Sequence, residues 1–463
     1  MIASPLRCHA RCESRLLVAG RARRLSSTTT RGCATCSDAW MRQANDRNSQ
    51  ETGMDRRRFF ALGGWAAAMP MLAHLGPAQA RADAPHAGSK RVDFTSDGLG
   101  LDPGEYASLL HDTAAAGAVG ADYYSNGGIV AELERSFAQM LGKQAAIFLP
   151  TGTLANQIAI RKLAGNDRRV LVQAESHLYN DSGDCAEVLS GLNLIPLAPG
   201  RASFELSQVR DWVERSAGGR VAMKVGAISI ENPVRRMDHR MFEFAELQRI
   251  SAYARELGIR LHLDGARLFN LPLHSGKSVR EHAALFDTVY VSLWKHFNAA
   301  SGAILAGDAA FIDGLYHTRR MFGGSLPQAW PEVALVPRYA PGFEADYANA
   351  WRVAEQLIAL LQADPRFTAQ RIADGTCRFV LKVAGVQPTA LAERAAKRGV
   401  ILPRAHPGSG DMPMQVNPTL LRVPAAQLAR WLIEAANGSG LGRREPDVRL
   451  PLARGRPCGD LRR

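Results

Sequence analysis

From about residue 91 onward, short apolar runs alternate with amphipathic stretches, and this alternation restricts the folds open to the chain. The apolar runs include AAIFL (145–149), VGAISIEN (225–232), IRLHLD (259–264) and TVYVSLW (288–294). Stretches with helical periodicity lie between them, for example at 153–165 and 240–257. Strands that alternate with helices in this way are typical of a mostly parallel sheet with helices on both faces. We therefore expect an α/β fold.

The pattern breaks around Pro331–Pro341, and a second group of elements follows. Apolar spacing predicts helices near 343–363, 389–398 and 425–437, together with a strand at 377–383. This group is long enough to form a smaller α/β domain of its own. We place a large domain at 91–335 and the smaller one at 336–438.

The net charge of +13 lies mostly at the two ends of the chain. Residues 1–81 hold 13 Lys and Arg against 5 acids, and residues 439–463 hold 7 Arg against 3 acids, which leaves +1 for 82–438. Nucleic-acid binding depends on basic side chains that neutralise phosphates, so we expect no nucleic-acid partner. The tail 439–463 is rich in Gly, Arg and Pro and is predicted to be disordered.

Four cysteines near the N-terminus have spacings that also occur in metal sites: Cys8, Cys12, Cys33 and Cys36. The surrounding sequence is rich in Arg, Ser and Thr and has no apolar periodicity. A zinc site there would lack a structured support, so we expect no metal ion in this protein.

Residues 54–81 have the three parts of a signal peptide. Arg56 and Arg57 stand at the start, an apolar stretch runs from about Ala61 to Leu75, and Ala78-Gln79-Ala80 provides small residues for cleavage. The apolar stretch is too short to span a bilayer. The paired arginines resemble the twin-arginine type, so we expect export in folded form to the periplasm, without stable membrane insertion after cleavage. An uncleaved anchor is the alternative, and an unused leader would leave the protein in the cytoplasm. Residues 1–53 are interpreted as a disordered or mis-annotated extension.

The segment Thr151-Gly152-Thr153 lies between the predicted strand 145–149 and the predicted helix 153–165. The first N–H groups of a helix have no partner within the helix, and together they bind anions such as phosphate. A threonine at a helix start is, however, most often only a cap. The signal is therefore weak when it stands alone.

An acid and a lysine follow two other predicted strands. Asp264 ends IRLHLD, and Lys295 follows 31 residues later at the end of TVYVSLWK. Ligands of open α/β sheets bind at the carboxyl ends of the strands. A lysine that forms a Schiff base, an acid that keeps the pyridine nitrogen protonated and a phosphate cradle together suit pyridoxal 5'-phosphate. Taken singly, Lys295 reads as a surface lysine and Asp264 as a loop carboxylate.

Several segments occur in the order found in one enzyme family: FLPTGTLANQIA (148–159), SIENP (229–233), LHLDGARLFN (261–270), SLWK (292–295) and GAILAG (302–307). Over roughly 91–438 they resemble the threonine aldolases, which are pyridoxal-phosphate enzymes of the aspartate-aminotransferase-like (type I) fold. The resemblance implies a large domain with a mostly parallel seven-stranded sheet and a smaller C-terminal α/β domain. It also implies a homodimer or homotetramer.

The resemblance further implies roles for individual residues. Lys295 would be the Schiff-base lysine, Asp264 would pair with the pyridine nitrogen, and Gly152 and Thr153 would hold the phosphate. His177 would stack on the cofactor ring and help to move the proton of the β-hydroxyl. The residues expected at the carboxylate of a small amino-acid substrate are Ser96, Arg267 and Arg422.

Three positions depart from the family pattern. Trp294-Lys295-His296 stands where the family commonly has Ser-Lys-Gly, and Pro233-Val234 follows Glu231-Asn232 where the family often has Thr-His. Ser96-Asp97 is followed by Gly98 instead of threonine. The cofactor residues are thus retained, while the pocket for the substrate's side chain is altered.

We expect a lyase that cleaves a β-hydroxy-α-amino acid to glycine and an aldehyde. Threonine, allo-threonine and a bulkier analogue such as phenylserine are the candidate substrates. The alternatives are another type I pyridoxal-phosphate enzyme, either a β-eliminating lyase or an aminotransferase, and an exported binding protein without catalysis. Formation of glycine from the substrate distinguishes the aldolase hypothesis from these alternatives.

Overall fold

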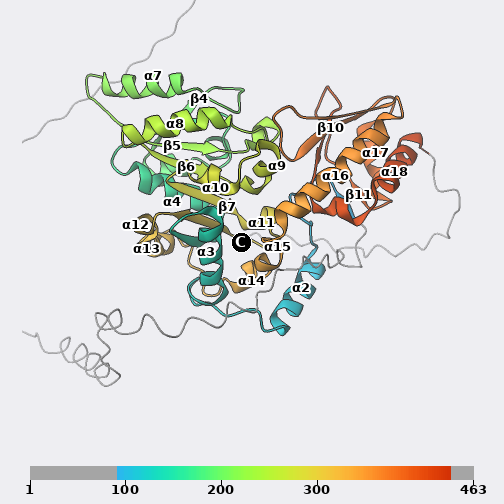
Figure 1. Ribbon diagram of the computed structural model, residues 1–463, viewed down its shortest axis with the longest axis horizontal. Helices are drawn as coiled ribbons and strands as arrows, with labels where there is room; N and C mark the ends of the chain where they lie inside the picture. The colour runs from blue at the N-terminus through green and yellow to red at the C-terminus, as the bar shows by residue number, and fades with distance from the viewer. Residues whose placement is uncertain (1–90, 439–463) are drawn as a thin grey trace, which may run out of the picture. The chain divides into compact units, whose positions relative to one another are not determined.

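The computed structural model describes residues 91–438 (Figure 1). The predicted extension (1–53), signal peptide (54–81) and basic tail (439–463) lie outside the described residues. The residues that are described all belong to one compact unit. Within 91–438, no helix has both the length and the apolar character needed to cross a bilayer.

A seven-stranded sheet organises the first part of the described chain, as the sequence predicted. Its strand order is β2-β8-β7-β6-β5-β3-β4. Strand β8 is antiparallel to both of its neighbours, and β7, β6, β5, β3 and β4 are parallel to one another. The strands are β2 (Ala145–Leu149), β3 (Arg169–Gln173), β4 (Asn193–Leu197), β5 (Val225–Glu231), β6 (Arg260–Asp264), β7 (Thr288–Ser292) and β8 (Ala303–Gly307).

Helices cover both faces of this sheet because side chains alternate between the faces along each strand. On one face, Tyr290 packs with Ile158 of α4. On the other face, Val289 and Val291 belong to the same core cluster as Phe137 of α3. The longer helices of this part are α2 (Pro103–Ala115), α3 (Gly128–Leu141), α4 (Gly152–Ala164), α7 (Leu206–Ala217), α8 (Phe244–Glu256) and α13 (Leu315–Met321). The shorter helices are α5 (His177–Asn180), α6 (Cys185–Ser190), α9 (Leu271–Ser275), α10 (Val279–Ala283), α11 (Leu293–His296), α12 (Ala309–Ile312), α14 (Trp330–Val333) and α15 (Val336–Tyr339).

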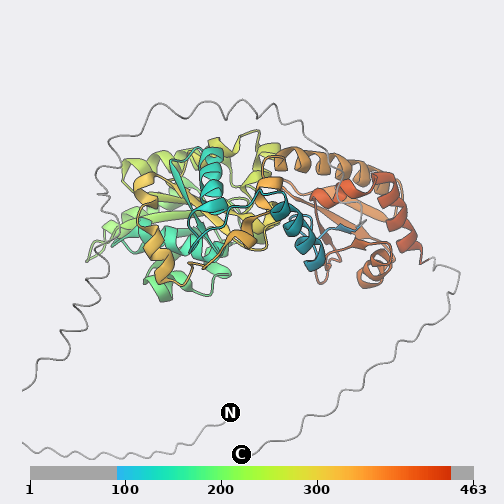
Figure 2. The same ribbon diagram turned by 90° about the horizontal axis from the view of Figure 1, so that it is seen from below.

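The C-terminal elements form a second, smaller sheet. It is antiparallel, with the order β12-β10-β9. The elements from α16 onward, drawn in orange to red, gather at one end of the described chain in both Figure 1 and Figure 2. These elements are α16 (Phe343–Gln362), β9 (Phe367–Arg371), β10 (Arg378–Val383), α17 (Pro388–Ala396), β11 (Val400–Ile401), β12 (Met412–Gln415), η4 (Pro418–Arg422) and α18 (Ala425–Asn437). The division into domains of 91–335 and 336–438 stays a prediction.

The start of the described chain joins this C-terminal group. Strand β1 (Val92–Asp93) pairs with β11, with Val92 opposite Val400. Further along, the backbone N–H of Gln415 donates to the carbonyl of Phe94 at 2.9 Å. These contacts fix the segment that follows β1, which carries Ser96 and Asp97.

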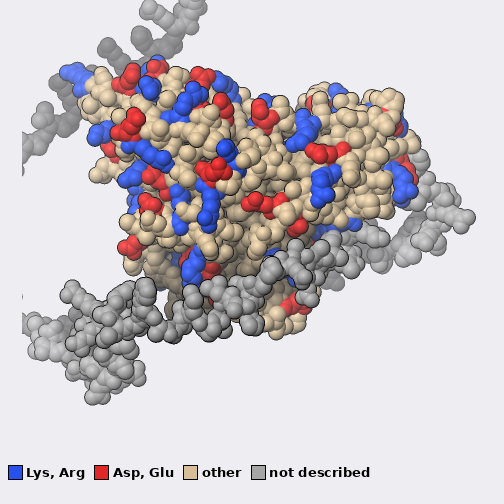
Figure 3. Space-filling view, viewed as in Figure 1, with Lys and Arg blue, Asp and Glu red and all other residues tan. Residues whose placement is uncertain are grey.

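Charged side chains are distributed as the near-neutral composition of 82–438 predicts. Basic and acidic groups are interspersed over the face shown in Figure 3. Several of them form exposed ion pairs along helices, such as Arg215 with Asp211. Exposed pairs of this kind contribute about 0–1 kcal/mol each to stability, so they do not explain how the fold is held together.

Candidate active site

The ends of two neighbouring strands and the start of α4 meet at one cavity. Asp264 is the last residue of β6, and Gly152 and Thr153 form the first turn of α4. Lys295 was expected at the end of a strand, but β7 ends at Ser292 and Lys295 lies in α11, immediately after it. The side chains or backbones of Gly152, Thr153, Asp264 and Lys295 all line this inner cavity. The predicted cofactor residues are therefore brought together.

His177 lines the same cavity from the first position of α5. Its backbone N–H donates to Glu231 Oε2 at 2.7 Å, which ties the start of α5 to the end of β5. Burial lowers the pKa of the His177 imidazole below its ordinary value, against the opposing effect of the Asp264 carboxylate. His177 is therefore mainly neutral at pH 7 and able to accept a proton.

Asp264 is held by a chain of hydrogen bonds that no local sequence motif predicts. Asn156 Nδ2 donates to Asp264 Oδ2 at 2.6 Å, and Asn156 Oδ1 lies 2.9 Å from His262 Nε2. His262 Nδ1 lies 2.8 Å from Thr288 Oγ1. Burial lowers the pKa of His262 to about 4, so the ring is neutral, and its Nε2 must carry the proton that Asn156 accepts. The available sequence signal was two polar residues at otherwise apolar, buried positions of α4 and β6.

Arg267 lies beside the inner cavity but is already engaged by a carboxylate. Its Nε and Nη2 atoms donate to the two oxygens of Asp97, each at 2.7 Å. Gln415 Nε2 also donates to Asp97, at 2.8 Å. Burial alone would raise the pKa of Asp97, but the Arg267 guanidinium lowers that pKa well below its usual range. This pair fixes the segment after β1 against the end of β6.

The two remaining predicted substrate residues are placed differently. Ser96 lines a second, outer cavity that adjoins the inner one. Arg422, in η4, donates from Nη1 to the carbonyl oxygen of Arg91 at 2.9 Å. It does not line the inner or the outer cavity. The structure thus brings Ser96 to the rim of the site and leaves Arg422 outside it, so a role for Arg422 at the substrate stays a prediction.

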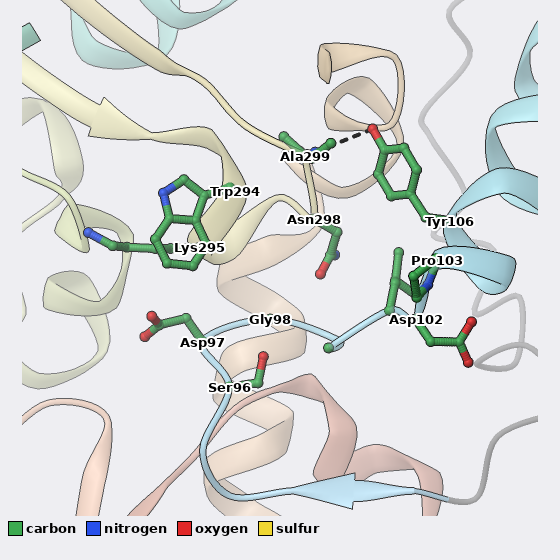
Figure 4. Close-up of a pocket in the computed structure, with 13 residues that line it drawn as sticks. Ser96, Asp97, Gly98, Asp102, Pro103, Tyr106, Trp294, Lys295, Asn298 and Ala299 are labelled. Atoms are coloured by element: carbon green, nitrogen blue, oxygen red, sulfur yellow. Dashed lines mark hydrogen bonds between the residues drawn. The ribbon is translucent and has the colours of Figure 1, made fainter. Parts of the chain in front are cut away.

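Lys295 and Trp294 line both cavities. Burial and the positive charge of Arg267 lower the pKa of Lys295 to about 8, which makes the neutral, nucleophilic amine more accessible. In Figure 4 the Lys295 amine points away from the outer cavity, and the Trp294 ring stands between them. Lys295 Nζ lies 5.5 Å from the centre of that ring, and the indole is half exposed.

The two cavities differ in size. The inner one has a volume of about 180 Å³ and the outer one about 530 Å³. Small-molecule sites typically measure about 300–1,000 Å³. The inner cavity alone is smaller than this range, so a cofactor together with an amino-acid substrate would need both. Figure 4 shows Tyr106 on the opposite side of the outer cavity from Trp294.

The altered segment after Glu231 places an arginine at the inner cavity. Val234 is fully buried, whereas Arg235 lines the cavity. The guanidinium of Arg235 forms an ion pair with Asp181, which also pairs with Arg236 at 2.8 Å. The side chain that replaces the family's histidine therefore points into the core, and the neighbouring arginine reaches the site instead.

These residues fit pyridoxal phosphate on their chemistry and placement. Lys295 offers an amine for the aldehyde, and Asp264 retains free lone pairs for a pyridine N–H. The Thr151 hydroxyl caps α4 by accepting from the N–H of Leu154 at 3.2 Å. The N–H groups of Gly152 and Thr153 are then the donors left for a phosphate at the helix start.

Comparison with known proteins agrees with this assignment. Residues 105–387 match the family model of the beta-eliminating lyases. The low specificity L-threonine aldolase of Saccharomyces cerevisiae is 27% identical over 298 residues, which cover 63% of this chain and 76% of that one. An alanine racemase of Cochliobolus carbonum is 26% identical over 331 residues, 68% of this chain and 82% of that one. The solved structure of a proposed L-allo-threonine aldolase from Listeria monocytogenes has a TM-score of 0.62 and 26% identity, and covers 73% of this chain and 94% of that one.

The matched family segment includes α4, β6 and Lys295, and it spans more than half of the chain. The structural match confirms the expected type I fold with its large, mostly parallel sheet. Both agree with the cofactor that the inner cavity fits. The chain belongs to the beta-eliminating lyase family, and it is a threonine aldolase-like lyase that depends on pyridoxal phosphate.

Proposed function

We propose that this protein cleaves a β-hydroxy-α-amino acid between Cα and Cβ, producing glycine and an aldehyde. The observation that carries the proposal is the convergence of Lys295, Asp264 and the first turn of α4 on one cavity. Similarity to threonine aldolases supports this reaction over others of the same fold. The substrates we propose are threonine, allo-threonine and bulkier analogues such as phenylserine.

Three groups of this chain would hold the cofactor. The Lys295 amine would bind its aldehyde, Asp264 its pyridine nitrogen, and the N–H groups of Gly152 and Thr153 its phosphate. When bound, pyridoxal phosphate supplies an electron sink for the bond that breaks at Cα. The relay from Thr288 through His262 and Asn156 keeps the Asp264 carboxylate oriented for this contact.

Cleavage next to a β-hydroxyl requires a group that accepts the hydroxyl proton. His177 is suited to this role because it lines the inner cavity and burial keeps it neutral. Glu231 fixes its backbone position. Among the described residues that line the inner cavity, His177 is the only histidine, and the position at which the family often has a second one carries the buried Val234.

The substrate carboxylate would bind between Arg267 and Ser96. Asp97 occupies Nε and Nη2 of Arg267, and this leaves Nη1 as a donor toward the cavities. Ser96 contributes a hydroxyl from the rim of the outer cavity. The Asp97 carboxylate thus orients the guanidinium without using all of its donors.

The substrate's side chain would extend into the outer cavity. Apolar and aromatic groups form much of its lining, including Leu101, Pro103, Tyr106, Trp294 and Ala299. The Tyr106 ring is fixed because its hydroxyl donates to the carbonyl of Pro331 at 2.8 Å. A half-exposed indole on one side of the cavity and a fixed phenol on the other favour an aromatic substituent over a methyl group.

Export and assembly belong to the proposal as well. The twin-arginine leader lies outside the described residues, and the structure describes a single chain. We propose export to the periplasm from the pattern of residues 54–81, and a homodimer or homotetramer from the resemblance to the threonine aldolases.

The reaction is tested by product analysis. Cofactor-loaded protein incubated with threonine, allo-threonine or phenylserine should release glycine and the matching aldehyde in equal amounts. Ammonia with a keto acid would indicate β-elimination, whereas a keto acid formed without free ammonia would indicate transamination. Racemisation of alanine without glycine formation would indicate the activity named for the Cochliobolus relative. Each of these results would contradict the aldolase proposal. A cofactor-loaded protein that converts neither threonine, allo-threonine nor phenylserine would contradict it too.

The role of His177 predicts a pH dependence. Because burial lowers its pKa, the neutral base should persist at pH 7, and kcat/KM should fall only as the pH drops through a value below 6.5. His177→Gln should reduce kcat by about 10²–10⁴-fold and remove this acidic limb. The exposed His317, changed to glutamine, serves as the control and should keep both rate and profile. A His177→Gln enzyme that retains the acidic limb would exclude His177 as the base.

The outer cavity predicts a change of specificity on removing Trp294. Trp294→Ala should lower kcat/KM for phenylserine by about 3–10-fold, since an aromatic pair contributes about 0.5–1.5 kcal/mol. Activity with threonine should change by less than about 2-fold, because a methyl group cannot form an aromatic pair with the indole. Leu360→Ala, at an exposed apolar residue outside both cavities, should affect neither substrate. Equal losses with both substrates would show that Trp294 does not select the side chain.

A further inference from the structure

Tyr290 is a buried phenol at the inner cavity to which the family resemblance assigns no role. It lies on β7, directly opposite Asp264 of β6, and only 3% of its surface is exposed. Its side chain extends on the face of the sheet that α4 covers, where it packs with Ala155 and Ile158. Tyr290 nevertheless lines the inner cavity, so its polar end reaches the site.

The phenol lies against the first residue of α4. A Cβ atom placed on Gly152 would lie 1.9 Å from Tyr290 Oη and 2.4 Å from Cζ. Gly152 does not adopt a positive φ, so backbone conformation does not require glycine at this position. The requirement is spatial, because Tyr290 occupies the volume that any side chain at position 152 would need. The two residues therefore form a matched pair at the start of the helix.

The phenol can act only as a neutral hydrogen-bond donor or acceptor. Burial, together with the negative charge of Asp264, raises the pKa of Tyr290 well above its usual range. The phenol therefore keeps its proton at neutral pH. A retained hydroxyl proton next to helix N–H groups adds a donor to an anion site.

The Tyr290 hydroxyl also matters because Trp294-Lys295-His296 lacks the serine that the family commonly has before its lysine. Trp294 stands where the family has serine, and its indole lies at the outer cavity, half exposed. Ser292 does not replace that serine at the cavity, because it is fully buried and does not line the inner cavity. Of these three β7–α11 side chains, Tyr290 is the one that brings a hydroxyl to both the cavity and α4.

We propose that Tyr290 is a phosphate-binding residue of this protein. Its hydroxyl would donate to the phosphate of the cofactor beside the N–H groups of Gly152 and Thr153. The inference deepens the proposed function only through the cofactor, and it does not depend on which bond of the substrate is cleaved. It assigns to β7 a phosphate contact that the resemblance alone does not supply.

The test compares two ligands that differ in the phosphate alone. Dissociation constants of pyridoxal phosphate and of pyridoxal are measured on the apo-protein, for the wild type and for Tyr290→Phe. Loss of a hydrogen bond to a charged group should weaken pyridoxal phosphate by about 10-fold or more. Pyridoxal should bind both proteins equally well. Inorganic phosphate should compete with the cofactor for the wild type. In Tyr290→Phe it should compete more weakly, with a correspondingly higher inhibition constant.

Tyr339→Phe is the matched control, since it removes a buried tyrosine hydroxyl that has no hydrogen-bond partner among the described residues and lies outside the inner cavity. It should change neither dissociation constant. If Tyr290→Phe weakens the binding of pyridoxal phosphate and of pyridoxal equally, the phenol acts on the pyridine ring or on Asp264, and the proposal is overturned. Unchanged binding of pyridoxal phosphate would overturn it too.

A measurement on the wild-type sequence covers the case in which Tyr290→Phe fails to fold, as judged from its thermal midpoint. With 3-fluorotyrosine incorporated, one buried fluorine resonance should shift on addition of inorganic phosphate to the apo-protein and should not shift with pyridoxal. If no tyrosine resonance responds to phosphate, the proposal is wrong. None of these readouts uses glycine formation, so failure of the aldolase assay would leave this inference standing.

Discussion

The organisation of this site depends on a buried carboxylate at the end of a parallel strand. Burying a charge is costly unless hydrogen-bond donors satisfy it. Asp264 accepts hydrogen bonds from Asn156 Nδ2 at 2.6 Å and from the backbone N–H of Ala266 at 3.2 Å. Because His262 is neutral, the hydrogen bonds run in one direction from Thr288 to Asp264. The relay joins α4, β6 and β7, so the elements that would hold the cofactor's two ends are fixed by the same interactions.

A second constraint ties the rim of the site to the sheet. The bidentate pair of Asp97 and Arg267 joins the segment after β1 to the residue that follows β6 by three positions. Gln415 extends this connection to β12 of the smaller sheet. Bidentate pairs of this type set orientation as well as distance. The guanidinium proposed to bind substrate is thereby held by the C-terminal elements as well as by the large sheet.

Much of the cofactor site could be predicted from local patterns. Asp264 ends one strand and Lys295 follows the neighbouring one. The carboxyl ends of parallel strands lie at one edge of the sheet, so the meeting of these two residues follows from topology. The start of α4 could be predicted from Thr151-Gly152-Thr153, which supply a cap and a glycine at the first position of the helix. By contrast, the pairing of β1 with β11 joins two-residue strands about 300 positions apart, and such short strands leave no pattern in the sequence. This pairing positions the segment around β1. The ion pair of Arg267 with Asp97 and the contact of Arg422 with the Arg91 carbonyl therefore could not be predicted either. Asn156, His262 and Tyr290 were visible only as polar groups at positions that otherwise read as apolar.

The central claim is that Lys295 holds the cofactor at the end of β7, and chemical trapping tests it most directly. Reduction of the cofactor-loaded protein with borohydride should fix the cofactor covalently, and peptide mass mapping should find its added mass on the peptide that contains Lys295. Lys295→Ala, treated in the same way, should carry no such mass. Attachment to another lysine such as Lys143 or Lys162, or an unmodified Lys295 peptide in protein that has bound the cofactor, would contradict the account.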